Sequence, residues 1–180
     1  GLPLVIRFND EGFPVIGFDI DSKKVHSLQS NQSYIRHISN EEIKQINING
    51  FDVTSDFSKI NNSDVIIICV PTPLGPHNEP DLSYIKNTLD LIKDHIRAEQ
   101  LLILESTTYP GTTEEEIVSY INQLGYKIGE DYFVGYSPER EDPGNLDFST
   151  KSIPKVVSGH TNDCLELTNL LYQKIVNKTV

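Results

Sequence analysis

The 180-residue sequence predicts an α/β protein built on a doubly wound parallel sheet. Apolar runs of strand length alternate with stretches of helical spacing along the whole chain, which is the pattern of such sheets. The clearest run, residues 64–70, is β-branched and apolar on both faces, as is typical of parallel strands covered by helices. No apolar run approaches the roughly 20 residues that span a bilayer. We therefore expect a soluble globular domain.

The order of the predicted elements has one irregularity. Strands are predicted at residues 15–20, 51–57, 64–70, 101–105, 132–136 and 153–158. Helices are predicted at residues 2–8, 22–29, 39–48, 81–96, 112–124 and 161–176. The sequence begins with a helix, whereas an open sheet of this kind begins with a strand, and it contains no methionine. We therefore expect an internal fragment that lacks the first strand of its sheet.

Capping residues mark several of the predicted helix ends. Ser22 is the expected N-cap of the second helix. Ser39 stands three residues before Glu42, which is the capping-box pattern. Asp81 is expected to cap the long helix that follows residues 71–80, and Gly125 to close the next one.

The charge and the metal-binding residue types exclude several classes of partner. The chain carries 26 acidic residues against 15 Lys and Arg, so its formal net charge is −11. Nucleic acid and anionic membranes are bound through Lys and Arg clusters, and none is present. Cys69 and Cys164 are too few and too far apart for a disulfide framework or a zinc site, and the five histidines show no ligand spacing. We expect a cytoplasmic protein without a metal and without nucleic-acid or membrane partners.

The first helix and the strand after it carry features of a dinucleotide site. Gly1 stands where the last glycine of a G-x-G-x-x-G turn would lie, at a helix N-terminus that favours a pyrophosphate. Asp19 ends the next strand, where an acid accepts hydrogen bonds from ribose hydroxyls and repels a 2′-phosphate. NAD is therefore favoured over NADP, with Lys24 near the adenosine. A second interpretation stays open, in which Asp19 only caps the helix that starts near Ser22.

Three loops that follow predicted strands are rich in polar residues, Pro and Gly. They cover residues 71–74, 105–112 and 136–144. Ordinary turns use the same residue types. Because doubly wound folds bind ligands at the carboxyl ends of their strands, three such loops on one edge favour a composite site.

Five segments of the sequence together resemble a known family. They are Gly-Leu-Pro-Leu at 1–4, Phe-Asp-Ile-Asp at 18–21, Cys-Val-Pro-Thr-Pro at 69–73, Glu-Ser-Thr-Thr-Tyr-Pro-Gly-Thr at 105–112 and Tyr-Ser-Pro-Glu-Arg at 136–140. In order and spacing they resemble the N-terminal NAD-binding domain of the UDP-glucose/GDP-mannose dehydrogenase family. The resemblance implies that residues 1–180 form one Rossmann-type domain, without the family's central helix and C-terminal UDP-sugar-binding domain. The last segment is most similar to the branch that acts on UDP-N-acetylhexosamines such as UDP-N-acetylglucosamine.

The resemblance also implies a reaction and residue roles. In the family, two NAD-dependent hydride transfers oxidise the sugar C6 alcohol to a carboxylate through a cysteine-bound intermediate. Asp19 and Lys24 would hold the adenosine side of NAD, and Thr72 would lie along the cofactor. Thr108 would contact the cofactor and help to hold a catalytic water, and Glu139 would act on that water as a general base.

The same resemblance implies a substrate-binding stretch and the limits of the fragment. The residues expected to border the sugar are Tyr136, Ser137, Pro138, Glu139 and Arg140. A surface ion pair between Glu139 and Arg140 is the alternative reading of that carboxylate. Cys69, in the strand expected to be most buried, and Cys164, in an amphipathic helix, match no nucleophile motif and are expected to be inert. The family's nucleophilic cysteine and oxyanion lysine lie beyond Val180, so the fragment alone is expected to be inactive and the full-length protein to form a dimer or a larger homo-oligomer.

Other functions remain as alternatives. A UDP-glucose or GDP-mannose dehydrogenase shares most of the quoted motifs. A nucleotide-binding module without catalysis would explain Gly1 and Asp19 alone. An S-adenosylmethionine-dependent methyltransferase also uses an acid after its second strand, but it does not predict Thr108 and Glu139 at two later strand ends.

Overall fold

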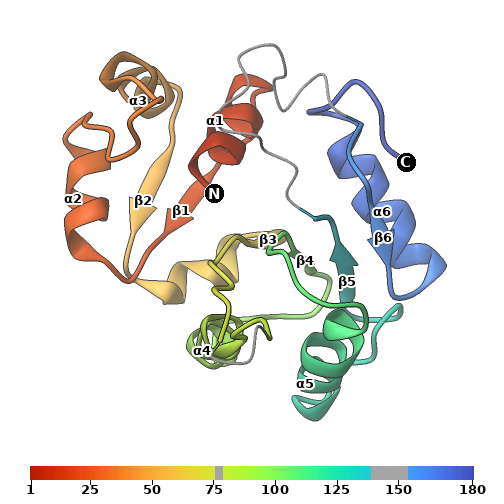
Figure 1. The fold of residues 1–180 in the computed structure, drawn as a ribbon. Helices are drawn as coiled ribbons and strands as arrows, with labels where there is room; N and C mark the ends of the chain where they lie inside the picture. The colour runs from red at the N-terminus through yellow and green to blue at the C-terminus, as the bar shows by residue number, and fades with distance from the viewer. Residues whose placement is uncertain (76–78, 139–153) are drawn as a thin grey trace. The chain divides into compact units, whose positions relative to one another are not determined.

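The computed structural model describes residues 1–75, 79–138 and 154–180. In these ranges the chain forms two compact units, Gly1–Phe57 and Ser58–Val180. Each unit contains its own sheet with parallel strands and its own helices (Figure 1). The prediction of an α/β fold with parallel strands is therefore confirmed.

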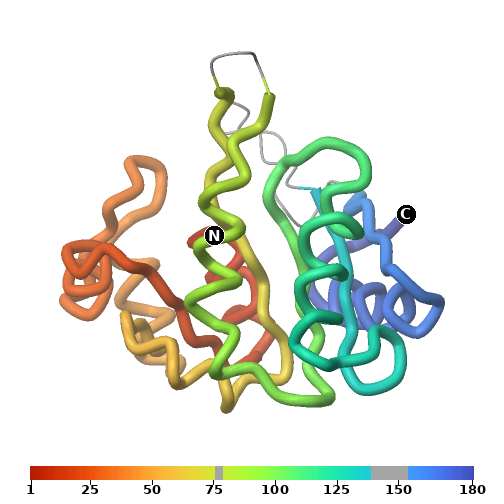
Figure 2. Tube along the Cα trace, turned by 90° about the horizontal axis from the view of Figure 1, so that it is seen from below, coloured from red at the N-terminus to blue at the C-terminus, as the bar shows by residue number. Residues whose placement is uncertain are grey.

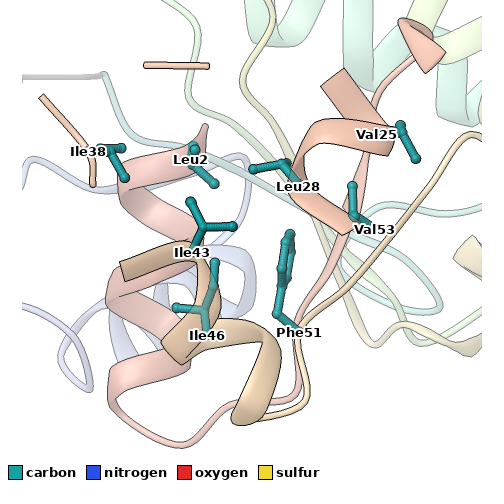
Figure 3. Packing of buried hydrophobic residues seen from close by; sticks show 8 residues of the cluster. All are labelled: Leu2, Val25, Leu28, Ile38, Ile43, Ile46, Phe51 and Val53. Atoms are coloured by element: carbon teal, nitrogen blue, oxygen red, sulfur yellow. The ribbon is translucent and has the colours of Figure 1, made fainter. Parts of the chain in front are cut away.

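The first unit places three helices beside a two-stranded sheet. Its elements are α1 (Leu2–Asp10), β1 (Ile16–Phe18), α2 (Ser22–Gln29), α3 (Asn40–Ile48) and β2 (Asp52–Thr54). Strands β1 and β2 are parallel, α1 packs against α3, and α2 packs against β2. Figure 3 shows the buried cluster that these elements share, formed by Leu2, Val25, Leu28, Ile38, Ile43, Ile46, Phe51 and Val53. Buried apolar residues from all three predicted helices therefore meet in one cluster.

The second unit is built on a four-stranded sheet in the order β3-β4-β5-β6. The 3₁₀-helix η1 (Phe57–Asn62) begins at the last residue of the first unit. The elements that follow are β3 (Val65–Ile68), α4 (Ser83–Ile92), β4 (Leu101–Leu104), the π-helix η2 (Thr113–Val118), α5 (Ser119–Gln123), β5 (Phe133–Tyr136), β6 (Ser158–Gly159) and α6 (Asn162–Tyr172). Figure 2 traces this part of the chain from yellow through green to the blue helix α6. Helix α6 packs against β4, β5 and β6, and η2 packs against β5.

The two sheets share no strand in the described ranges. In the first unit β1 pairs with β2, and in the second unit β3 pairs with β4.

Two predictions about strands are wrong. The segment at residues 64–70 was expected to be the most buried strand, but in β3 buried and half-buried residues alternate, whereas every residue of β4 is buried. Among the described residues β4 has a paired strand on each side, whereas β3 is paired with β4 alone, so its side chains are less covered. The strand predicted at residues 153–158 is reduced to Ser158–Gly159, and it runs antiparallel to β5. Residues 151–153 lie outside the described ranges.

Helix boundaries follow the predicted caps in part. The capping box is confirmed, since Ser39 Oγ accepts from Glu42 N at 3.2 Å and a Glu42 carboxylate oxygen accepts from Ser39 N at 2.8 Å. The N-cap of α2 is Asp21 rather than Ser22, because Asp21 Oδ1 accepts the Lys23 N–H at 2.9 Å. Asp21 and Ser22 are both good caps, and tertiary packing selects between such neighbours.

Two further helices differ from the prediction. The helix expected to reach residue 96 ends at Ile92. The predicted helix at residues 112–124 begins with a π-helical segment, and Gly125 follows it with a φ of 96°, as expected for a residue just after a helix.

Candidate functional site

In the first unit, the carboxylate of Asp19 lies just after β1. Its two oxygens accept from Asp21 N at 2.9 Å and from Lys24 Nζ at 3.3 Å. The side chain is 29% exposed, and a carboxylate can accept further hydrogen bonds. Because Asp21 is the N-cap of α2, the interpretation of Asp19 as a mere helix cap is wrong. Asp19 is therefore available to a hydroxyl-bearing ligand at the end of β1.

Lys24 is held between Asp19 and an aromatic ring. Its Nζ lies 5.6 Å from the centre of the Tyr34 ring. Burial by itself lowers the pKa of Lys24, but the hydrogen bond and the charge of Asp19 raise it, and the net shift is upward. The ammonium group therefore stays charged beside the carboxylate.

The N-terminus of α1 suits an anion. Gly1 is its N-cap and supplies no side-chain acceptor, and the first turn contains no acidic residue. The first N–H groups of a helix have no partner within the helix, and the helix dipole favours negative charge there. The side chains of Leu2, Leu4 and Phe8 are buried, so they anchor the helix in the protein. Gly1 and Asp19 thus fit the phosphate and ribose parts of a dinucleotide.

In the second unit, hydrogen bonds join the loops that follow β3 and β4. Thr72 Oγ1 donates to the carbonyl of Thr107 at 2.5 Å. Ser106 Oγ donates to the carbonyl of Val70 at 2.6 Å. These bonds tie the two residues before Thr108 to the segment that follows β3. Thr108 itself is half-buried.

An open pocket of about 520 Å³ lies at the carboxyl ends of β4 and β5. It is lined by Thr108, Tyr109, Pro110, Gly111, Thr113, Glu114, Tyr136, Ser158, Gly159 and His160. The structure therefore brings together Thr108 and Tyr136 from two of the three loops predicted to form a composite site. The π-helix η2 begins at the pocket, and π-helical turns are frequent at functional sites.

The remaining predicted substrate residues differ in their surroundings. Ser137 is fully buried, and its Oγ donates to the carbonyl of Val156 at 2.8 Å. Pro138 is half-buried. Glu139 and Arg140 lie outside the described residues.

The pocket also contains residues that sequence reasoning missed. Ser158, Gly159 and His160 line it because β6 is antiparallel to β5, so that it starts at the edge where β5 ends. The sequence holds no local signal for this, since strand direction depends on a partner far along the chain.

The described residues contain neither a cluster of metal-binding side chains nor a membrane-spanning helix. Within residues 1–75, 79–138 and 154–180, no group of three or more His, Cys, Asp or Glu side chains could hold a metal ion. In the same ranges no helix is long and apolar enough to cross a membrane.

Both cysteines of the chain lie in the second unit. Cys164 is fully buried, and its Sγ accepts from Val134 N at 3.4 Å. This confirms that it is a core residue. Cys69 follows β3 and is only half-buried, so its assignment to the most buried strand is wrong.

Known proteins resemble this chain along its whole length. Protein CapL of Staphylococcus aureus is 37% identical to it, over 100% of this chain and 42% of the relative. A UDP-N-acetyl-D-glucosamine 6-dehydrogenase of Pseudomonas aeruginosa is 34% identical, over 98% of this chain and 41% of the relative. The solved structure of the UDP-N-acetyl-mannosamine dehydrogenase Cap5O from Staphylococcus aureus superposes with a TM-score of 0.92 and 30% identity, over 100% of this chain and 44% of that one.

These matches place the chain within a longer type of protein and within one family. The chain spans about two fifths of the length of the curated relatives that it matches. The family model described as "UDP-glucose/GDP-mannose dehydrogenase family, NAD binding domain" matches residues 1–176. The chain therefore belongs to the UDP-glucose/GDP-mannose dehydrogenase family and corresponds to its NAD-binding domain.

Proposed function

We propose that this chain is the NAD-binding part of a nucleotide-sugar 6-dehydrogenase that oxidises a UDP-N-acetylhexosamine to the uronate in two steps. The observation that carries the proposal is the pocket that joins Thr108 to Tyr136 at the carboxyl ends of β4 and β5. Doubly wound folds bind their ligands at this edge of the sheet. Membership of the dehydrogenase family supplies the reaction class.

The family motifs indicate which residues within each unit would contact NAD. In the first unit, Gly1 at the start of α1 would face the pyrophosphate, and Asp19 with Lys24 would bind the adenosine ribose. In the second unit, Thr72 and Thr108 would lie along the nicotinamide part. When bound, NAD supplies the hydride acceptor for an alcohol oxidation.

The catalytic residues of this chain would act on water. Thr108 would orient a water molecule through its hydroxyl, which can donate and accept. Glu139 would take a proton from that water as a general base. Tyr136, Ser137, Pro138 and Arg140 would border the sugar. Glu139 and Arg140 lie outside the described residues, so their part of the proposal rests on the sequence motif.

The substrate proposal rests on the relatives. Relatives between 32% and 34% identical to this chain are named for UDP-N-acetyl-D-glucosamine and UDP-N-acetyl-D-mannosamine. A GDP-mannose dehydrogenase structure is 27% identical, with a TM-score of 0.85. A UDP-N-acetylhexosamine is therefore the first substrate to test. We also propose that the full-length enzyme acts in the cytoplasm as a homo-oligomer, with its nucleophile outside residues 1–180.

The direct test is turnover by the full-length protein that contains this chain. NADH formation would be followed with UDP-N-acetylglucosamine, UDP-N-acetylmannosamine, UDP-glucose and GDP-mannose. We expect oxidation of a UDP-N-acetylhexosamine, with two molecules of NADH formed for each molecule of sugar oxidised. NAD binding without turnover of any nucleotide sugar would instead identify a binding module. Retention of S-adenosylmethionine in place of NAD would favour a methyltransferase.

The cofactor contacts have a matched test. Asp19→Asn removes a charged acceptor, and a hydrogen bond to a charged group contributes about 1.5–3 kcal/mol. NAD affinity should therefore fall about 10- to 100-fold in calorimetry. Asp21→Asn is the control, because it removes a neighbouring charge while Asn still caps α2. Equal NAD affinity of the two variants would contradict the assignment of Asp19.

A further inference from the structure

Three polar side chains from distant parts of the second unit form a buried cluster. Glu105 directly follows β4, Lys155 precedes β6, and Tyr172 is the last residue of α6. The Glu105 and Lys155 side chains are 1% and 5% exposed, and Lys155 Nζ lies 2.8 Å from Glu105 Oε2. The Tyr172 hydroxyl donates to the other carboxylate oxygen, and its ring centre lies 5.5 Å from Lys155 Nζ. One carboxylate therefore joins three elements.

The cluster extends to the segment that follows β5. Burial raises the pKa of Tyr172 well above its usual value, and the charge of Glu105 raises it further, whereas a hydrogen bond with Ser137 lowers it in part. The Tyr172 hydroxyl thus keeps its proton and remains a donor. Ser137 N also donates to the carbonyl of Leu104 at 3.0 Å. Ser137 directly follows Tyr136, so the cluster is tied to one wall of the pocket.

The cluster is also tied to the loop that carries Thr108. Glu105 N donates to the carbonyl of Ile68 at 2.9 Å, and Ser106, the next residue, is held by its bond to Val70. Thr108 follows three residues after Glu105. A shift of the Glu105 carboxylate would therefore move the start of the Thr108 loop.

The buried ion pair between Glu105 and Lys155 is not readily explained by a contribution to stability. Removing two charges from water costs several kcal/mol per ion, and buried ion pairs are often replaced by apolar side chains without loss of stability. The cluster does, however, link Glu105, three residues before Thr108, through Tyr172 to Ser137 beside Tyr136, and it thereby restricts the spacing of these two segments. Catalysis is sensitive to such spacing, since a displacement of about 1 Å costs about 10²-fold in rate.

We propose that Glu105, Lys155 and Tyr172 are positioning residues that hold Thr108 and Tyr136 at the spacing the reaction requires. The inference rests on the proposed function, because it needs a reaction at this pocket. The three residues act through the backbone of two loops and are not themselves catalytic residues.

The experiment compares two tyrosine variants of the full-length protein. Tyr172→Phe removes the hydroxyl that donates to Glu105 and keeps the ring. Tyr126→Phe is the matched control, because it removes a half-buried hydroxyl that donates to the carbonyl of Ile96 at 3.3 Å and does not line the pocket. We would measure kcat, the KM for NAD and for the sugar, and Tm. Tyr172→Phe should lower kcat about tenfold with the KM for NAD within about twofold of wild type, and Tyr126→Phe should keep the wild-type kcat.

Two further variants separate position from charge. Glu105→Gln keeps the shape of the side chain but removes the negative charge that Lys155 Nζ contacts, and it should lower kcat about 10²-fold. Lys155→Arg keeps the positive charge, whereas Lys155→Met removes it. At an assay temperature below the Tm of both variants, Lys155→Arg should have the higher kcat. If the Glu105 variant fails to fold, the tyrosine pair decides the question.

The outcomes distinguish the inference from the proposed function. If the wild-type protein turns over a nucleotide sugar and Tyr172→Phe has the same kcat as the control Tyr126→Phe, the positioning role is overturned and the proposed function is not. A fall in Tm with unchanged kcat would likewise assign the cluster to stability and overturn it. A wild-type protein that turns over no nucleotide sugar would overturn the proposed function and this inference together.

Discussion

Substitution of Gly135 by alanine should destabilise the second unit through one contact with α6. A Cβ at Gly135 would overlap Thr168 Oγ1 and would lie 3.1 Å from Cγ2 and 3.2 Å from Cβ of the same residue. Thr168 is fully buried, and its hydroxyl donates to the carbonyl of Cys164 at 2.7 Å. The added methyl group therefore has no empty space to enter.

The expected cost follows from these contacts. The Thr168 hydroxyl must retreat by about 1 Å to restore an ordinary contact. Overpacking of this kind costs about 1–3 kcal/mol, and loss of a buried hydrogen bond costs about 1 kcal/mol more. We expect Gly135→Ala to lower the free energy of unfolding by about 2–4 kcal/mol in urea denaturation followed by circular dichroism.

A second substitution tests the mechanism. Thr168→Ala deletes Oγ1 and Cγ2, the two nearest atoms, so the Gly135→Ala/Thr168→Ala variant should be more stable than the sum of the single changes by about 1–3 kcal/mol. Gly159→Ala is the control, because its Cβ would meet backbone atoms, with Cys164 C at 2.5 Å and Leu165 Cα at 2.6 Å. Thr168→Ala should not rescue it. Additive effects in the first pair, or a Gly135→Ala cost below about 0.5 kcal/mol, would refute the reasoning.

Three further predictions concern other parts of the chain. Gln100 is fully buried and donates to two backbone carbonyls at 3.0 and 2.7 Å, so Gln100→Ala should lower the free energy of unfolding by about 2–3 kcal/mol in urea titrations, whereas a surface glutamine would cost almost nothing. In thiol titrations Cys69 should react in the folded protein and Cys164 only after denaturation; early reaction of Cys164 would contradict its burial. Ser39→Ala should cost about 1 kcal/mol at neutral pH. The backbone and side-chain hydrogen bonds of Ser39 lower the pKa of Glu42 below its ordinary 4.5, so this part of the stability is present above that value and is lost as the pH falls through the lowered pKa. A cost of Ser39→Ala that stayed constant down to low pH would contradict the capping box.

Local signals in the sequence predicted most elements and, in the first unit, the position of Asp19 at the end of a strand. The capping box at Ser39 and the placement of Asp19 after a strand each depend on residues within a few positions of one another. The interpretation of Asp19 as a helix cap fell because Asp21, two positions away, takes that role. The sequence alone could not show whether Asp19 or Asp21 caps α2, since this depends on where β1 ends.

Contacts between distant residues could not be predicted in the same way. Glu105 was counted among the polar residues of a loop, yet its carboxylate is buried against Lys155, fifty positions away. The antiparallel direction of β6 brings His160 to the pocket, and it depends on the pairing with β5. The pairing of β3 with β4 alone, among the described strands, likewise depends on distant segments. Apolar runs indicate that a strand exists but not which strands lie beside it.

The sequence by itself determined the α/β class, the order of the elements, the family motifs and the acid after β1, because these are recorded in short-range periodicity and capping. Only the tertiary structure decided that Thr108 and Tyr136 line one pocket, that every residue of β4 is buried whereas only alternate residues of β3 are, and that a buried ion pair connects the end of β4 to the segment before β6. The physical reason is that burial and ion pairing depend on which distant segments meet, and that is settled only when the sheet and its helices have packed together.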